Sequence, residues 1–464
     1  MRFVANLRQE TIDAFSAEQI QPAAYLLSSH RITPATLRMA STIRGKNLPL
    51  FADNGTKPLI EQTVALFERR ATTIQHEVRE LRLRLGRVPR KSDISSELRR
   101  QAAKLADEVI RHATGISNEA DPAELLDAQL SMKPTHLIAK EDFATACLIA
   151  LDLEREFTGW PVSRWDARNR RTLKLWKAVA KDPRCKDVLV YAVLSAVDYD
   201  TARSAGRLAA QHGVRHAALG IAGINLDQSA TDYFVIGRTT VEIDRPAPRR
   251  FIRLAQILRG VADGYEEVGT SLVSFHCLGL GAPAMLPIAA AAVGERTVLT
   301  ADATSPIHDA VRDHVLYNFV EQGDRSTTVE IVKRLVEGKA WPLSSPFAEA
   351  FSARFGHHPR KARQVWIEQG QPSITKKLLR TPSGITVELP LLSMADPATI
   401  ALASKVHIAH NHWVLGELCE AFPDKRGRHR AASSAMRAWI ARQSSNSTTR
   451  GMTAAQQVFD AVDD

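Results

Sequence analysis

Cysteine is scarce in this chain, and its spacing excludes two kinds of covalently or metal-stabilised fold. The 464 residues contain four cysteines, and no two of them form a Cys-x-x-Cys or Cys-x-Cys pair. They stand at Cys147, Cys185, Cys277 and Cys419. We therefore predict neither a disulfide framework nor a zinc knuckle, and a reducing compartment fits this cysteine usage.

Long apolar runs are lacking near the N-terminus. The segment MRFVANLRQETIDAF carries charges at Arg2, Arg8 and Glu10, and its apolar stretches are too short for a signal peptide or a membrane span. We therefore expect no membrane partner and a cytoplasmic location. Positive charge is in excess, with a formal net charge of +10. This excess is compatible with a polyanionic partner but does not by itself indicate one.

Short apolar runs alternate with amphipathic helical patterns in the middle of the chain, as expected for buried parallel strands joined by helices. The runs cover residues 188–197, 216–224, 272–281 and 297–303. The clearest helical patterns cover residues 200–213 and 248–264. Such a repeat fits a closed (β/α)8 barrel or an open doubly wound sheet, and periodicity does not choose between them. In both folds the chemistry lies at the carboxyl ends of the strands.

Residues 58–130 differ from the rest of the chain because they are helical in pattern, strongly charged and rich in arginine. Gly86, Pro89 and Ser92 mark a turn within them, so we predict a helical hairpin inserted into the barrel. Its charges serve either as a solvated surface or as a contact for nucleic acid. The predicted division is an N-terminal part of the barrel at 1–57, the insertion at 58–130, the rest of the catalytic barrel at 131–345, and a C-terminal helical and basic region at 346–464.

Two aspartates stand where the chemistry of such a fold is expected. Asp302 ends the run TVLTAD, and Asp53 ends LPLFAD just before an Asn-Gly turn. A carboxylate pair is suited to breaking a glycosidic bond, because one member can attack the anomeric carbon while the other handles the proton on the base. A strand-terminal Asp often only caps the next turn, so residue chemistry alone leaves both interpretations open.

The segment around Asp302 resembles the tRNA-guanine transglycosylase family. In that family a strand ending in a Gly-x-Gly-x-Pro turn leads through a helix and a glycine to a Phe-Asp pair, whose Asp is the nucleophile. The residues that fall in this register here are Gly279, Gly281, Pro283, Gly294, Asp302, Pro306 and Ala310. The resemblance implies an α/β fold of the (β/α)8 TIM-barrel type, with a helical insertion and a C-terminal helical extension, and it implies that Asp302 is the nucleophile.

Shorter segments extend the resemblance from about residue 20 to about residue 420. FADNGT (51–56) resembles the family's Thr-Asp-Ser-Gly-Gly-Phe-Gln segment, which implies Asp53 as general acid/base and places Asn54 beside it at the substrate. HLIAKEDFA (136–144) resembles the strand that ends in the carboxylate reading the purine edge. That carboxylate would be Glu141 or Asp142.

Two further segments correspond to the loops that read the heterocycle. YAVLSA (191–196) stands where the family has Val-Gln-Gly-Gly, so Leu194 or Ser195 replaces the Gln and Ser195 is a candidate contact. AALGIAG (217–223) stands where the family has Ile-Gly-Gly-Leu-Ala. This match gives Gly220 as the contact to the base, with Gly223 behind it.

The family's zinc site is incomplete in this chain. HIAHNHW (407–413) resembles the segment whose His binds structural zinc, but the Cys-x-Cys-x-x-Cys cluster that should precede it is missing. A site of His407, His410 and His412 is conceivable, although histidines at this spacing are more often structural. We predict no metal and no cofactor.

Because the loops have changed while the Asp pair is kept, the resemblance implies an unusual base or nucleic acid. One branch of the family inserts 7-deazaguanine precursors such as preQ0 into DNA, and this branch suits the pattern. The implied function is a base-exchange pentosyltransferase that replaces guanine in DNA with a free 7-deazaguanine through a covalent Asp-glycosyl intermediate. A paired target base would have to be flipped from the stack.

Three alternatives remain open: an enzyme acting on tRNA, a non-catalytic nucleic-acid-binding partner subunit, and an unrelated TIM-barrel enzyme acting on a small molecule. Assembly as a homodimer or with subunits of a modification complex is compatible with the DNA-modifying function implied by the resemblance. The basic residues expected to contact phosphates are Arg87, Arg90 and Lys91 in the insertion and Arg360 and Lys361 in the segment HHPRKAR.

Overall fold

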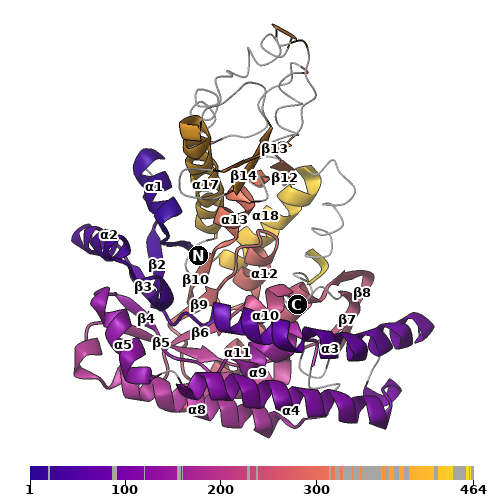
Figure 1. The fold of residues 1–464 in the computed structure, drawn as a ribbon. Coiled ribbons are helices and arrows are strands. Elements are labelled where there is room, and N and C mark those ends of the chain that lie inside the picture. The colour runs from indigo at the N-terminus through magenta and orange to yellow at the C-terminus, as the bar shows by residue number, and fades with distance from the viewer. Residues whose placement is uncertain are drawn as a thin grey trace.

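The fold is a closed barrel of eight parallel strands surrounded by helices, seen in a computed structural model (Figure 1). The structure describes residues 1–18, 21–85, 91–119, 121–153, 160–226, 230–236, 239–312, 315–318, 324–327, 376–380, 386–390, 397–422 and 427–442, with isolated positions up to 460. The barrel strands are β1 (Arg2–Asn6), β2 (Ala24–Ser28), β3 (Leu50–Asp53), β4 (His136–Ile138), β5 (Leu189–Leu194), β6 (His216–Gly220), β9 (Ser274–Leu278) and β10 (Val298–Ala303). The predicted TIM barrel is thus confirmed, and the open sheet is excluded.

Closure depends on pairing between the first and last strands. β1 pairs parallel with β10, with Val4 opposite Asp302. Along each strand the side chains alternate between the barrel interior and the surrounding helices. The interior layer includes Val4, Leu26, Phe51 and Tyr191. An inward position two residues further along a strand therefore lies at the carboxyl end of the barrel.

The predicted strand and helix runs in the middle of the chain are found where expected. The four apolar runs contain β5, β6, β9 and β10, and the two helical patterns correspond to α9 (Tyr199–Gln211) and α11 (Arg249–Val268). These two helices pack with very short separation. A Cβ added to Gly206 of α9 would overlap the carbonyl oxygen of Val261 in α11, so glycine is needed at that crossing.

Other helices complete the layer around the barrel. They are α1 (Gln9–Glu18), α2 (Pro34–Gly45), α6 (Ala144–Ala150), α8 (Val162–Ala180), α10 (Ala222–Leu226), α12 (Met285–Ala292) and α13 (Ser305–Val311). An antiparallel hairpin of β7 (Ala230–Ile236) and β8 (Thr239–Pro248), which we did not predict, stands between α10 and α11.

The predicted helical insertion is present between β3 and β4. It consists of α3 (Lys57–Leu85), α4 (Ser96–Glu119) and α5 (Pro122–Ser131). The α4 helix runs beside α8 along one side of the barrel (Figure 1). Arg164 of α8 forms an ion pair with Asp107 of α4. Buried positions of α4 recur at helical spacing. They are Leu98, Ala102, Leu105, Ala106, Val109 and Ala113.

The basic residues predicted to contact phosphates lie outside the part of the chain that the structure describes. Arg87, Arg90, Arg360 and Lys361 lie outside the described residues, as does the side chain of Lys91. The helical insertion, to which Arg87, Arg90 and Lys91 belong, packs against the barrel and its surrounding helices.

A small hairpin of β11 (Val315–Asn318) and β12 (Asp324–Thr327) follows the last barrel strand, within the residues 131–345 that were predicted to complete the barrel. The predicted C-terminal helical extension contains a second hairpin, of β13 (Lys376–Arg380) and β14 (Thr386–Pro390), and the helices α17 (Pro397–Glu420) and α18 (Arg428–Arg442). Arg428 joins this region to the barrel. Its fully buried guanidinium donates hydrogen bonds to the carbonyl oxygens of Ala290, Val293 and Thr297 at and beyond the end of α12. Within the described part of the chain, no helix has the length and apolarity required to cross a bilayer.

Two glycine substitutions test the close crossing of α9 and α11. Gly206→Ala should lower the free energy of unfolding by about 1–3 kcal/mol, because the new methyl group forces the helices apart. Gly115→Ala is the matched control in the interior of α4, where an added Cβ meets nothing within 4 Å. It should raise stability by up to about 1 kcal/mol through helix propensity. Urea unfolding measures both values, and equal effects of the two changes would contradict the packing described.

Candidate active site at the mouth of the barrel

A cavity of about 530 Å³ opens at the carboxyl end of the barrel strands. Among its lining residues are Asn6, Ser28, Asp53, Gly220 and Asp302, which end or nearly end five of the eight strands. Parallel strands bring these positions together although they are far apart in the chain. The volume lies in the range typical of pockets for small molecules and cofactors.

Asp302 is buried and is held by hydrogen-bond donors from strand β1 and from the loop that follows β9. The side-chain amide of Asn6 donates to Oδ2 at 2.7 Å, and the backbone N–H of Gly279 donates to Oδ1 at 3.0 Å. Gly279 has a φ of 82°, a left-handed conformation that favours glycine. The amide of Asn225 holds the same loop by donating to the Gly279 carbonyl at 2.8 Å. The donors from Asn6 and Gly279 fix the orientation of the Asp302 carboxyl group.

A histidine lies against the same carboxylate. His276, on β9 and fully buried, places Nε2 3.4 Å from Oδ1 of Asp302. Its other ring nitrogen, Nδ1, is 2.8 Å from the hydroxyl of Thr300. The carboxylate therefore faces polar groups of β1, of β9 and of the loop that follows β9.

The surroundings of Asp53 disfavour its charged form. Burial, followed by the negative charge of Asp302, raises the pKa of Asp53, and hydrogen bonds from Ser28 and Gly55 only partly offset this rise. The Ser28 hydroxyl donates to Oδ2 at 2.8 Å and also lies 2.9 Å from Nδ1 of His30. A carboxyl group whose pKa is raised can carry a proton and donate it to a leaving group.

Glu141 is a third acidic group in the cavity. Burial raises its pKa to about 7, with a further contribution from the charge of Asp53. The amide of Asn54 lies 3.4 Å from Oε1 of Glu141 and donates to the Ala139 carbonyl at 3.0 Å. Asn54 also accepts a hydrogen bond from the Thr56 hydroxyl. Glu141 and Asn54, both predicted at the substrate, therefore do line the cavity.

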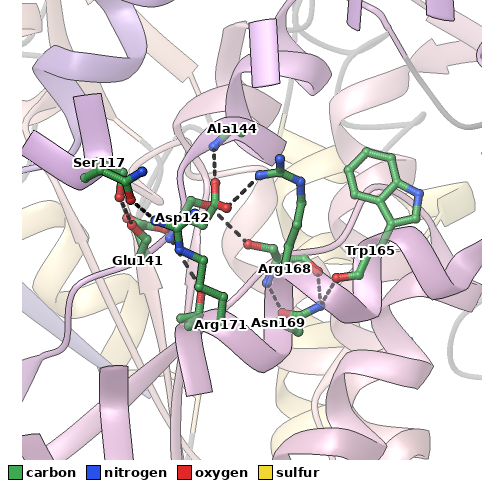
Figure 2. A network of polar contacts seen from close by, with 11 residues as sticks. Ser117, Glu141, Asp142, Ala144, Trp165, Arg168, Asn169 and Arg171 are labelled. Carbon is green, nitrogen blue, oxygen red and sulfur yellow. Dashed lines mark hydrogen bonds and ion pairs between the residues drawn. The ribbon is translucent and has the colours of Figure 1, made fainter. Parts of the chain in front are cut away.

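Asp142 and Ser195, by contrast, do not line the cavity. Asp142 forms an ion pair with Arg168 of α8 at 2.6 Å and accepts a hydrogen bond from the backbone N–H of Ala144 (Figure 2). The backbone of Ser195 is held by the side chain of Asn169, and its hydroxyl donates to the Asp142 carbonyl at 3.3 Å. Both residues join barrel loops to α8. Of the two carboxylates predicted as alternatives, only Glu141 faces the cavity.

The two predicted loop glycines also differ in position. Gly220 ends β6 and lines the cavity, and a Cβ there would lie 3.8 Å from the Glu141 carboxylate. Gly223 lies behind it in α10, where a Cβ would overlap the carbonyl of Ala146 in α6. Gly223 therefore permits close contact between two helices, and only Gly220 is placed to contact a ligand.

Basic side chains also line this acidic cavity. Arg8, Arg31 and Lys57 are among the lining residues. Arg8 approaches Nε2 of His308 at 3.4 Å, and its pKa is lowered by burial and then by the charge of Arg31. Lys57 donates to the Thr304 hydroxyl at 3.1 Å, next to the end of β10. A ligand with a neutral or cationic centre and negatively charged outer groups would match this distribution.

The three histidines considered for a metal lie in the middle of α17 and are buried. Nε2 of His410 is 2.7 Å from the Tyr317 carbonyl, and Nδ1 of His412 is 2.8 Å from the Ile408 carbonyl. Among the residues that the structure describes, no group of three or more His, Cys, Asp or Glu side chains is arranged to hold a metal ion.

Several polar residues of this site were missing from the predicted set. Asn6, Ser28 and His276 are polar residues at inward positions of strands that are mostly apolar. A polar residue at such a position was the available signal. His30, Arg31 and Lys57 lie in or at the start of helical segments, and no sequence pattern marked them.

Searches against protein-family models and against curated proteins found no match for this chain.

The adjacent carboxylates Glu141 and Asp142 should respond in opposite ways to loss of charge. Folded Glu141 has a pKa of about 7 against an ordinary value of 4.5, so the folded state binds more protons between these pH values and loses stability as pH rises through them. Glu141→Gln should therefore gain stability relative to the wild type from pH 5 to pH 8, by up to about 3 kcal/mol.

Asp142→Asn, in contrast, should lower the free energy of unfolding at pH 7 by about 2–3 kcal/mol, because it leaves the largely buried Arg168 without its carboxylate. Urea unfolding of both variants and the wild type at pH 5, 7 and 8 measures these differences. A pH-independent effect of Glu141→Gln, or a stabilising effect of Asp142→Asn, would be inconsistent with the contacts described.

Proposed function

We propose that the chain is a base-exchange pentosyltransferase that replaces guanine in a nucleic acid, with DNA favoured over tRNA, by a free 7-deazaguanine such as preQ0. The observation that carries this proposal is the pair of carboxyl groups in one cavity, of which Asp302 is held by two donors and Asp53 has a raised pKa. Such an asymmetric pair suits double displacement at an anomeric carbon. The resemblance around Asp302 supports the choice of a guanine base.

In the first half of the proposed reaction, Asp302 attacks C1′ of the target nucleotide. The C1′–N9 bond breaks, and Asp53 donates its proton to the departing guanine. Both changes pass through an oxocarbenium-like transition state, whose positive charge the Asp302 carboxylate stabilises. The product is a glycosyl ester on Asp302 and a neutral free base.

In the second half, the incoming 7-deazaguanine gives its N9 proton to Asp53 and attacks C1′, and the ester bond to Asp302 breaks. The proton lost by Asp53 is thus regained, and the cycle needs no redox cofactor or nucleoside triphosphate. Glu141 lines the same cavity and would accept hydrogen bonds from purine N–H groups in its ionised form.

Basic residues of the cavity support a nucleic acid rather than a free nucleoside as the substrate. Arg8, Arg31 and Lys57 line the same cavity as the two aspartates, and cations there suit the phosphates that flank a flipped nucleotide. The net charge of +10 also supports a nucleic acid as substrate, because it favours association with a polyanion.

Base exchange should require Asp302. The wild type, incubated with labelled preQ0 and either guanine-containing DNA or tRNA, should transfer label to the polymer, and Asp302→Asn should lower the rate by at least about 10³-fold. Asp127→Asn, which removes an exposed carboxylate on α5, is the control and should retain the activity. Label in tRNA alone would reverse the order of the two substrates, and no label in either polymer would contradict the function.

The role of Asp53 can be separated from that of Asp302 by a change of leaving group. Asp53→Asn should release guanine about 10²–10⁴-fold more slowly, because no acid protonates the departing base. A polymer that contains 7-methylguanine needs no such proton, since its base is already cationic. It should restore base release to Asp53→Asn but not to Asp302→Asn. Equal recovery of both variants would contradict the assignment of roles.

A further inference from the structure

His276 occupies a fixed place beneath the proposed nucleophile. It lies on β9 directly opposite Thr300 of β10, and Asp302 follows two residues later on the same inward face of β10. The imidazole stacks on Phe51 at 4.8 Å between ring centroids and meets Tyr191 edge to face at 6.3 Å. With no exposed surface, the ring has its position and orientation set by the barrel interior.

The two ring nitrogens face different groups. Nδ1 lies 2.8 Å from the Thr300 hydroxyl, while Nε2 lies 3.4 Å from Oδ1 of Asp302 and has no hydrogen-bond partner among the described residues. In a neutral imidazole only one nitrogen carries a proton. A bare Nε2 would direct its lone pair at the carboxylate, which is repulsive, whereas an Nε2–H would be attracted to it.

Thr300 can determine which ring nitrogen of His276 carries the proton. Its hydroxyl is 2.8 Å from Nδ1 but 3.4 Å from the Phe275 carbonyl, so donation to Nδ1 is the better-formed of the two hydrogen bonds. A hydroxyl that donates to Nδ1 leaves the ring proton on Nε2, directed at Asp302. The partner of one ring nitrogen commonly determines the state of the other in this way.

We propose that His276 is a positioning residue for Asp302, held by Thr300 in the tautomer that carries its proton on Nε2. This inference rests on the proposed function, because it gives Asp302 its role as nucleophile. At 3.4 Å the N–H supports one carboxylate oxygen without the tight contact that Asn6 makes to the other. The carboxylate is thereby kept turned toward C1′ before attack, and the same N–H stabilises the ester oxygen as a leaving group when the second base arrives.

Kinetics of matched variants test this inference. His276→Leu should lower kcat for base exchange by about 10²-fold with little change in KM, since the lost interaction acts on the reacting carboxylate rather than on substrate binding. His276→Gln can return an amide N–H to the Nε2 position and should remain within about 10-fold of the wild type. A kcat for His276→Leu equal to that of the wild type would overturn the inference.

Thr300→Val should cost about 10-fold in kcat, because it removes the hydroxyl that selects the tautomer while preserving side-chain shape. Thr297→Val is the matched control: Thr297 is also buried, donates its hydroxyl to the Leu272 carbonyl at 2.9 Å, and lies at the opposite end of β10. It should retain kcat even if both variants lose similar stability. Equal losses of kcat in the two variants would show a general packing effect instead.

The tautomer can be measured in the free protein by ¹⁵N NMR of labelled histidines, with the His276 signals assigned by their loss in His276→Gln. We expect Nε2 protonated and Nδ1 unprotonated in the wild type, and a larger Nδ1–H population in Thr300→Val. A proton on Nδ1 in the wild type would overturn the inference. Because this measurement needs no substrate, it decides the question separately, whereas failure of base exchange by the wild type contradicts the proposed function.

Discussion

Closure of the barrel between β1 and β10 is the constraint on which the candidate site depends. These strands are almost 300 residues apart, and their parallel register places Val4 beside Asp302, so that Asn6 and Asp302 meet through a hydrogen bond of 2.7 Å. A shift of one residue in this register would turn Asp302 toward the surrounding helices. Because strand order and register fix the site, its geometry is carried by backbone pairing more than by loops.

A second constraint is electrostatic. The cavity gathers Asp53, Glu141 and Asp302 in surroundings that water reaches poorly, and burial raises the pKa values of the first two. Charged carboxylates in such a place lower the free energy of unfolding, and packing in the rest of the barrel has to offset this loss. The same arrangement places a carboxyl group held by two donors beside a carboxyl group whose pKa is raised. Such an asymmetric pair is what the proposed acid-assisted glycosidic cleavage needs.

The sequence predicted the architecture well because its signals were local. Apolar runs such as 188–197 become strands, and the charged, helical pattern after residue 57 becomes α3, α4 and α5. The hairpin of β7 and β8 was missed. The sequence does hold a signal for it, because YFVI and TTVEI are rich in β-branched and aromatic residues and are separated by the two residues Gly-Arg.

The site was predicted less completely because side-chain direction depends on register and tertiary contacts. Glu141 and Asp142 are adjacent in sequence, yet one faces the cavity and the other pairs with Arg168. Gly220 and Gly223 divide in the same way between the cavity and a helix contact. Asn6 and His276 stand out in sequence only as polar residues within mostly apolar strands. Their contact with Asp302 depends on which strands are neighbours, and a short segment of sequence does not show this.

The central claim is that Asp302 carries the sugar between the two halves of the reaction. It is tested most directly by denaturing the wild type during turnover with a guanine-containing oligonucleotide, digesting the protein, and mapping the modified peptide by mass spectrometry. The account predicts a pentose ester on Asp302 that forms without preQ0 and disappears when preQ0 is added. An ester on another residue, or base exchange without any covalent adduct, would contradict it.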